Sequence, residues 1–313
     1  MNWMGHRVSA DRIEVLDGLG FKHAEPWQLY VSGQGLNLDE ELSGLGERPM
    51  GAVVGLHGSL PLVSKARLWV GLVKRFGRAK ATRLVPPTWI LNHPPDRENL
   101  AGRPGPFIVK APGKQRRQGL TLVDTAEQAL ESTKGVVQPV LPTMLLAGHA
   151  FHMRCHVLVK VGPAGVDILL HRVAKLVYAT HPASTGGFEG LITQGDAPVP
   201  RGAPRTVAEF ARTLEDPNAV LGGIPRCLKA VMTTFPLRAP AAATVAVMPF
   251  GVDLLVGPDG QVRVLEVNRR PDLTGRNAED SKLKQKVWLD TLRVAGVVDG
   301  KVEADILASV PAP

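Results

Sequence analysis

Three polar residues near the C-terminal end of the chain could together bind a metal ion. Asp253, Glu266 and Asn268 lie in or beside two apolar stretches, residues 250–256 and 262–267. Both stretches alternate apolar residues with others, as β-strands do, and the Gly-Pro-Asp-Gly sequence between them predicts a turn, so we expect a β-hairpin. Two carboxylates and one amide oxygen suit Mg²⁺, a hard cation that takes oxygen ligands and keeps substrate phosphates as partners.

The register of this hairpin decides whether the three residues meet. A four-residue loop places Val256 opposite Gln261, and Asp253 is then opposite Val264. In that register the three polar residues share one face of the hairpin, and a shift by one residue would scatter the acids among core residues. The opposite face is then filled by four apolar residues, Val252, Leu254, Leu265 and Val267. The alternative is a solvent-facing hairpin with ordinary polar residues.

A lysine ends an apolar strand in the middle of the chain. Lys110 closes the stretch 107–110, and a glycine-bounded basic loop, residues 111–119, follows before another strand at 120–123. Loops of this kind can wrap phosphates, because backbone N–H groups and lysines both attract anions. The loop is not a P-loop, since the Gly-x-x-x-x-Gly-Lys-Ser/Thr spacing is missing. A surface hairpin with solvated charges is the alternative.

Two arginines interrupt predicted strands that are otherwise apolar. Arg154 lies in the stretch 151–161 and Arg172 in the stretch 166–173, with a Gly-Pro-Ala-Gly turn between the stretches. An arginine on a buried face needs an anionic partner, because an unpaired buried charge is costly. The partner could be a bound phosphate, or equally the carboxylate of a structural salt bridge.

Histidines and a cysteine around Arg154 raise the question of a zinc site. His149, His152, Cys155 and His156 are close in sequence, but no second Cys/His pair has the spacing of a structural zinc site. On a strand, His152 and His156 share the face of Arg154 while Cys155 points away. We therefore expect ordinary polar histidines, or histidines at the edge of a ligand.

The remaining patterns indicate the elements that must position these residues. Apolar residues at helical spacing predict a helix over 65–76, with basic residues between them, and a short apolar run predicts a buried strand over 50–57. Residues 85–106 are rich in proline and indicate a boundary or linker. Further helices are expected at 125–132 with Asp124 as N-cap, at 206–214, at 224–235 and at 281–294 with Ser281 as N-cap, a strand at 135–141 and a loop at 186–203.

Composition narrows the class of protein. The chain has 313 residues, 44% of them hydrophobic, so we expect a substantial core and more than one subdomain. We expect neither a membrane span nor a secretory signal, because no long apolar run is present, and two cysteines give no disulfide framework. A cytoplasmic protein is therefore predicted. The formal net charge of +8 favours an anionic partner, but sparse aromatics, at 5%, make nucleic acid a poor candidate.

The order of these motifs resembles that of the tubulin tyrosine ligase-like family of the ATP-grasp ligases. The strand ending at Lys110 is similar to the family's phosphate-contacting lysine strand, and the Gln-Pro-Val-Leu segment from Gln138 to Leu141 resembles its adenine hinge. The stretch Ala-Phe-His-Met-Arg ending at Arg154 resembles the family's Lys-Phe-Asp-Ile-Arg. Arg172, six residues before Tyr178, resembles the family's second arginine. The spacing of the Asp…Glu-x-Asn hairpin is that of its magnesium triad, and the resemblance covers roughly residues 50–295.

The resemblance implies an α/β (α+β) fold of the ATP-grasp type, with nucleotide held between two mainly antiparallel sheets and a short N-terminal α/β subdomain. It implies three parts: an N-terminal subdomain at 1–84, a central subdomain at 85–142, and a C-terminal subdomain at 143–313. ATP and Mg²⁺ are the implied cofactors. The implied residue roles are metal ligands at Asp253, Glu266 and Asn268, nucleotide contacts at Lys110, Gln138, Leu141 and His152, and catalytic cations at Arg154 and Arg172.

The implied activity is an ATP- and Mg-dependent carboxylate–amine ligase that forms an amide through an acylphosphate. Its expected partners are a free amino acid and an acidic protein, peptide or small carboxylate acceptor. Two other functions stay open from the residues alone. One is a small-molecule amino-acid ligase or kinase on the same fold, and the other is a non-catalytic module that binds a nucleotide or another anion.

Overall fold

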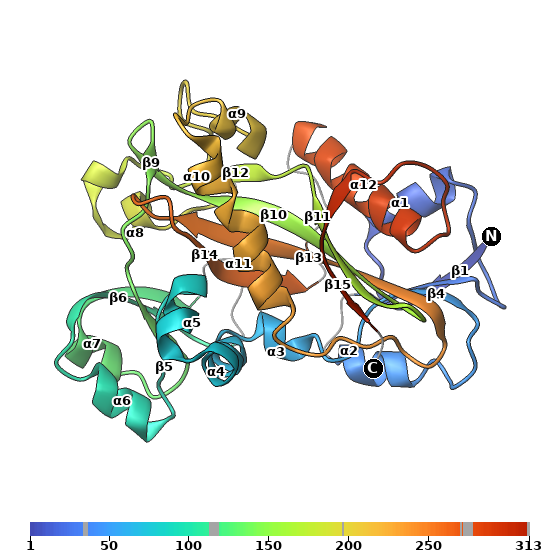
Figure 1. Ribbon diagram of the computed structural model, residues 1–313, viewed down its shortest axis with the longest axis horizontal. Coiled ribbons are helices and arrows are strands. Elements are labelled where there is room, and N and C mark those ends of the chain that lie inside the picture. The colour runs from blue at the N-terminus through green and yellow to red at the C-terminus, as the bar shows by residue number, and fades with distance from the viewer. Residues whose placement is uncertain (34–36, 113–118, 196, 270, 272–277, 312–313) are drawn as a thin grey trace.

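The computed structural model describes residues 1–33, 37–112, 119–195, 197–269, 271 and 278–311. Strands from both ends of the chain form one large mixed sheet, and a segment from the middle forms a second, smaller sheet (Figure 1). The two sheets and the helices around them make a mixed α/β fold, which agrees with the fold class that we predicted and is compatible with an ATP-grasp-like arrangement. None of the described helices has the length and apolar character needed to cross a membrane.

The C-terminal half of the chain supplies the antiparallel part of the large sheet. Its central strands are the long β10 (His149–Gly162) and β13 (Ala243–Val256), which pair with each other. The strands that extend this part on either side are β9 (Leu145–Leu146), β11 (Gly165–His171), β12 (Lys175–Tyr178), β14 (Val262–Arg269) and β15 (Ala304–Pro311). The alternation of apolar residues in β10 and β13 therefore gives the sheet one apolar face and one polar face near the hairpin.

The N-terminal residues extend the same sheet with parallel strands. These strands are β1 (Asn2–Gly5), β2 (Lys22–His23), β3 (Leu29–Val31) and β4 (Gly51–Val54). Strand β4 pairs in parallel with the first half of β13, so that Val54 lies beside Val247. The expected N-terminal subdomain thus shares its sheet with the strand that carries Asp253.

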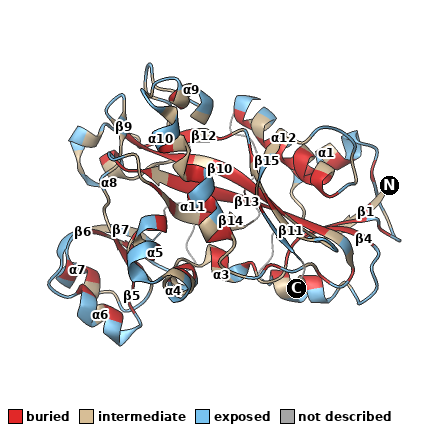
Figure 2. Ribbon diagram, in the orientation of Figure 1, coloured by how far each residue is buried: buried red, intermediate tan, exposed pale blue. Residues whose placement is uncertain are grey.

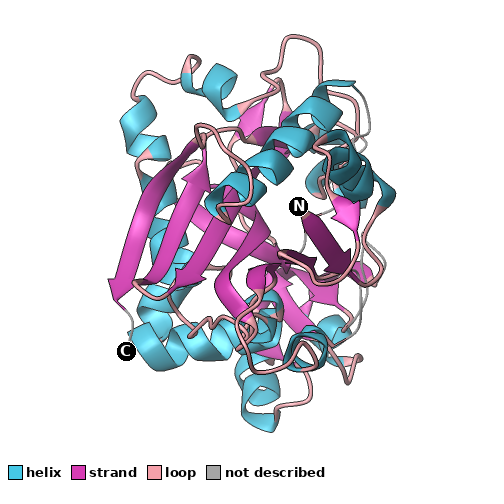
Figure 3. Ribbon diagram, turned by 90° about the vertical axis from the view of Figure 1, so that its right-hand side faces the viewer, coloured by secondary structure: helices cyan, strands magenta, loops and turns pink. Residues whose placement is uncertain are grey.

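Helices cover both faces of the large sheet (Figure 3). On one face lie α1 (Ala10–Gly18) and α12 (Ala278–Val294), whose Leu16 and Trp288 pack against sheet residues such as Leu158. The helices at the other face or beside it are α2 (Leu38–Ser43), α3 (Leu60–Val63), α4 (Lys65–Phe76), α5 (Arg78–Leu84), α10 (Pro217–Leu221) and α11 (Gly223–Met232). Buried residues accordingly concentrate along the strands between these layers (Figure 2).

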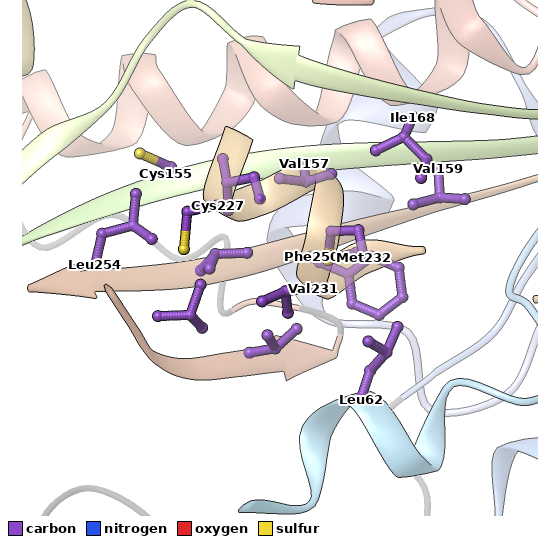
Figure 4. Packing of buried hydrophobic residues seen from close by; sticks show 14 of the residues in the cluster. Leu62, Cys155, Val157, Val159, Ile168, Cys227, Val231, Met232, Phe250 and Leu254 are labelled. Atoms are coloured by element: carbon purple, nitrogen blue, oxygen red, sulfur yellow. The ribbon is translucent and has the colours of Figure 1, made fainter. Parts of the chain in front are cut away.

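The larger core lies between the sheet and α11. Cys155 and Val157 of β10, Phe250 of β13 and Met232 of α11 are among the buried side chains that meet there (Figure 4). Both cysteines are free, and burial raises the pKa of each thiol to about 12, so they remain protonated at neutral pH. This apolar contact fixes the orientation of β10 and β13, and therefore of the polar residues on their opposite face.

The smaller sheet is antiparallel and lies at the lower left of Figure 1. Its strands, in spatial order, are β5 (Trp89–Ile90), β8 (Val136–Pro139), β6 (Pro104–Lys110) and β7 (Leu120–Thr125). Two helices, α6 (Pro94–Leu100) and α7 (Ala126–Leu130), pack against it around Trp89 and Phe107. All four strands fall inside the range 85–142, where we expect the central subdomain, and the boundaries of the three subdomains stay a prediction.

Several local expectations hold and others need correction. The helix predicted over 65–76 is α4, in which Ser64 accepts a hydrogen bond from the Arg67 amide as N-cap. The expected linker at 85–106 instead contains β5, α6 and the start of β6. Two of its prolines, Pro94 and Pro95, occupy the first turn of α6, where no amide hydrogen is needed. The expected loop at 186–203 contains α8 (Gly187–Leu191), which follows a short 3₁₀ turn, η1 (Ala183–Thr185). The helix expected at 206–214 is the short α9 (Val207–Ala211).

Two predicted N-caps are wrong. The cap of α7 is Thr125 rather than Asp124, because Thr125 and Gln128 form a reciprocal capping box that satisfies two amides at once. Ser281 lies inside α12, which the structure describes from Ala278 onward.

Candidate functional site

The predicted hairpin is present, but its register differs from the one that we expected. Val256 pairs with Val262 rather than Gln261, so the loop is one residue longer, and a β-bulge follows at Leu265. The bulge realigns the strands, so that Asp253 lies directly opposite Glu266, not opposite Val264. Leu265 is consequently only partly buried, and Val264 packs in the core in its place.

The three polar residues share one face of the hairpin in this register. Asn268 lies opposite Gly251, two residues from Asp253, and side chains two residues apart on a strand point the same way. Gly251 allows close packing on that face: a Cβ atom there would lie 3.1 Å from Pro271 Cβ, which is tighter than an ordinary contact, and 3.7 Å from Arg154 Cδ. Two carboxylates and an amide oxygen together form a set of oxygen ligands that fits a hard cation.

Arg154 and His152 lie on the same face as Asp253, where Arg154 holds its carboxylate by hydrogen bonds and His152 lies beside it. Arg154 is directly opposite Asp253 in the β10–β13 ladder and donates from both Nε and Nη2, the latter over 2.8 Å to Oδ2. His152 Nε2 lies 3.3 Å from Asp253 Oδ1, and His152 Nδ1 lies 2.6 Å from Thr193 Oγ1. Despite burial, which raises it, the pKa of Asp253 is held well below its usual range by His152 and Arg154. Asp253 is therefore ionised at neutral pH, as a metal ligand must be.

Glu266 contacts a lysine that we did not identify from the sequence. Lys65 is the first residue of α4, and its Nζ lies 3.1 Å from Glu266 Oε2. Lys110, at the end of β6 in the small sheet, is close enough that burial and Lys65 lower its pKa to about 8, while Glu266 opposes the change. Two lysines from separate parts of the fold thus approach the hairpin. The only signal for Lys65 in the sequence is its place at a helix start, and that does not reveal its contact with Glu266.

Gln138 also lies at this junction between the two sheets. It lines a small pocket together with Lys65, Glu266 and Thr88. Its amide nitrogen donates to Thr88 Oγ1 over 2.8 Å, while its buried oxygen has no hydrogen-bond partner among the residues that the structure describes. Leu141, which we expect to contact the nucleotide with Gln138, is partly buried just beyond the end of β8.

Other predicted site residues are not brought to this junction or cannot be described. Arg172 follows β11 and forms an exposed ion pair with Asp305 of β15, with Nη2 2.7 Å from Oδ1. Within the basic loop expected at 111–119, residues 113–118 lie outside the described part of the chain. Among the described residues, no three or more histidines, cysteines, aspartates or glutamates are grouped so that they could hold a metal ion. The predicted magnesium site has only two acids and therefore needs Asn268 as its third ligand.

A buried histidine near the site gives the fold a pH dependence that can be tested. Burial, followed by the charge of Arg154 and contributions from His171, Lys175 and Lys284, lowers the pKa of His156 to about 3. A histidine in an unfolded chain titrates near pH ~6.5. Below that pH the unfolded chain binds a proton that the folded chain rejects, so stability is full above it and falls as the pH decreases.

We therefore expect the free energy of unfolding to fall by about 2 kcal/mol more in the wild type than in His156→Gln between pH 7 and pH 5. Urea unfolding of both proteins at the two pH values measures this difference. Equal losses in the two proteins would show that His156 is not the group responsible.

The fold and the hairpin together are compatible with the class of enzymes that bind ATP between two sheets. Residues 229–304, from α11 to the start of β15 and including the whole hairpin, match the sequence model of the Tubulin-tyrosine ligase family. The match confirms the resemblance to this family that the order of motifs indicates. A comparison with curated proteins returned no significant match.

Proposed function

We propose that this protein is an ATP- and Mg-dependent carboxylate–amine ligase that forms an amide bond through an acylphosphate. The observation that carries the proposal is the direct pairing of Asp253 with Glu266, beside Asn268, within the segment that matches the family. Ligases of the tubulin-tyrosine ligase family join an amino acid to a protein or peptide in an ATP-dependent reaction, and the match over residues 229–304 supports the same kind of reaction for this protein.

The site residues fall into two groups with different tasks. Asp253, Glu266 and Asn268 would hold Mg²⁺, which supplies Lewis-acid charge to the phosphates of ATP when bound. Positive side chains around them attract and orient the phosphates; these are Lys65, Lys110 and Arg154. Lys110 retains its proton on most molecules at pH 7, because its pKa remains near 8.

The chemistry needs no nucleophile from the protein. A carboxylate oxygen of the acceptor attacks the γ-phosphorus, the bond to the β–γ bridging oxygen breaks, and ADP leaves. The amine then attacks the carbonyl carbon of the acylphosphate, phosphate leaves, and the amine loses a proton to solvent. Arg154, held in place by Asp253, can stabilise the negative charge that develops on the transferred phosphoryl group.

A survey of ADP release tests the proposal. Single amino acids are combined with glutamate-rich peptides or small dicarboxylates, and products are identified by mass spectrometry. We expect ADP release that requires both substrates and a product whose mass equals their sum minus water. A phosphorylated product would identify a kinase instead, and ATP binding without any release would identify a non-catalytic module.

An acidic acceptor is expected because positive charge is concentrated near the site. Helices α4 and α5 carry no acidic residue, and several of their basic side chains are exposed: Arg67, Lys74, Arg75, Arg78, Lys80 and Arg83. Electrostatic attraction of this kind raises association rates and weakens with salt.

We expect kcat/KM for an acidic peptide to fall several-fold between low and physiological salt, and to fall less in the double variant Arg67→Gln/Lys74→Gln. Initial rates at a series of ionic strengths measure the slope for both proteins. If kcat/KM of the wild type does not change with salt, charge does not steer the acceptor to this surface.

A further inference from the structure

Lys175 lies beside Arg154, whereas the sequence resemblance assigns the second cation of the site to Arg172. Strands β10 and β12 pair so that Arg154 is directly opposite Lys175, and opposite residues share a face of the sheet. Lys175 is thus on the face that carries Asp253, and only strand β10 separates β12 from β13. Its side chain is partly exposed, at 20%, so it reaches solvent on that face.

Lys175 belongs to a group of charges shared with α12. Its Nζ donates to Asp280 Oδ1, and Lys284 Nζ lies 3.1 Å from the other oxygen of the same carboxylate. Asp280 and Glu266 both act electrostatically on Arg154, together with Asp253. The charges of the hairpin and of α12 therefore form one continuous group with Arg154 at its centre.

Arg172 occupies a different environment. Its guanidinium donates to both oxygens of Asp305 on the edge strand β15, and the two side chains are 56% and 61% exposed. In addition, β11 ends at His171, so Arg172 is outside the ladder that aligns β10 with β12. No contact of Arg172 with Arg154 or Asp253 is present in the described part of the chain.

We propose that Lys175, rather than Arg172, is the second cation that binds the phosphates of the nucleotide beside Arg154. This inference rests on the proposed function, because it assigns a residue to the same site. Lys175 can exchange Asp280 for a phosphate without leaving the Asp280 carboxylate unpaired, because the ion pair between Lys284 and Asp280 remains. Its flexible stem and three ammonium donors suit such an exchange of partners.

The electrostatic environment of Lys175 agrees with a site that is completed by an anion. Burial is the main cause that lowers its pKa, Asp280 opposes the change, and the nearby charges of Lys284 and Arg154 lower the pKa further. An anionic phosphate on this face would favour the charged form of Lys175 in the same way as Asp280 does.

The test measures nucleotide affinity rather than turnover. Wild type, Lys175→Met, Lys175→Arg and the matched control Arg172→Met are titrated with Mg-ATP and with AMP by isothermal calorimetry. We expect Lys175→Met to weaken ATP binding about tenfold or more, since a charged hydrogen bond is lost, and to change AMP binding little. Lys175→Arg should retain most of the ATP affinity, and Arg172→Met should bind both nucleotides as the wild type does.

The outcomes separate failure of this inference from failure of the proposed function. If the wild type binds no ATP, the proposed function fails, and the role of Lys175 fails with it. If the wild type binds ATP and Lys175→Met binds it equally well, the proposed function stands and the inference is overturned. Equal weakening of ATP and AMP by Lys175→Met, or selective loss of ATP affinity in Arg172→Met, also overturns it. If Lys175→Met does not fold, Lys175→Gln, which can still donate to Asp280, replaces it in the same comparison.

Discussion

Replacing Glu266 by glutamine is expected to reduce ATP-dependent turnover by roughly a thousandfold while the protein stays folded. Glu266 lies opposite Asp253 on the face that we assign to the metal, and the substitution removes a negative charge but keeps the shape of the side chain. Removing one group that stabilises charge in a transition state costs about 3–4 kcal/mol. The salt bridge to Lys65 is partly exposed, so its loss should cost at most about 1 kcal/mol of stability.

Glu303→Gln is the matched control for this substitution. The carboxylate of Glu303 also pairs with one lysine, Lys286, and its side chain is exposed to the same extent as that of Glu266, 39%. Turnover and Mg-dependent nucleotide binding are measured for both variants beside their urea unfolding curves. Full activity in Glu266→Gln would remove Glu266 from the metal site, and equal loss in both variants would point to a general effect of charge.

Arg154→Met should combine loss of activity with a large loss of stability. Asp253 is buried beneath Arg154, and removing one partner of a buried ion pair leaves an uncompensated charge. We expect the free energy of unfolding to decrease by about 3 kcal/mol, toward the lower end of such effects because Arg154 is partly exposed and His152 still contacts Asp253.

The double variant Arg154→Met/Asp253→Asn separates the two roles of Arg154. Without the carboxylate no buried charge is left unpaired, so much of the lost stability should return, while turnover should stay absent. Urea unfolding and ADP release of the two single variants and the double variant complete the cycle. If the double variant is no more stable than Arg154→Met, the ion pair is not the source of the effect.

The hairpin shows which features of the site could be predicted from patterns in the sequence. Alternation along β13 and β14 was enough to predict two strands and a shared face for Asp253, Glu266 and Asn268, and this arrangement is present. The bulge at Leu265 was not predictable, because an inserted residue changes the pairing partner without changing the local pattern of apolar residues. The expected register was wrong, but the three residues still share a face. The longer loop and the bulge together shift the pairing by two residues, and a shift by two leaves each side chain on its original face.

Contacts between segments that are far apart in the chain could not be predicted from the sequence. Lys65 and Glu266 belong to a helix and a strand far apart in the chain, and no periodicity in either segment encodes their meeting. The strand lysine at Lys110 and the helix 65–76 were each predicted correctly as local elements. Their approach to one hairpin follows from packing between the two sheets, which local patterns do not describe.

The cations near Arg154 show a further reason why the site could not be predicted completely from the sequence. Arg172 and Lys175 are three residues apart, so a uniform strand would place them on opposite faces. The choice between them depends on where β11 ends and β12 begins, and that break is set by pairing with β15 and β10. The sequence resemblance favoured Arg172, whereas the register favours Lys175.

Transfer of oxygen from the acceptor to phosphate tests the central claim most directly. An acidic peptide acceptor whose carboxylates carry ¹⁸O is incubated with Mg-ATP, the protein and the amino acid that supports ADP release. An acylphosphate route moves one carboxylate oxygen into the released phosphate, so mass spectrometry should find one ¹⁸O atom per phosphate and an amide product in equal amount. Unlabelled phosphate, or ADP release without an amide product, would contradict a carboxylate–amine ligase.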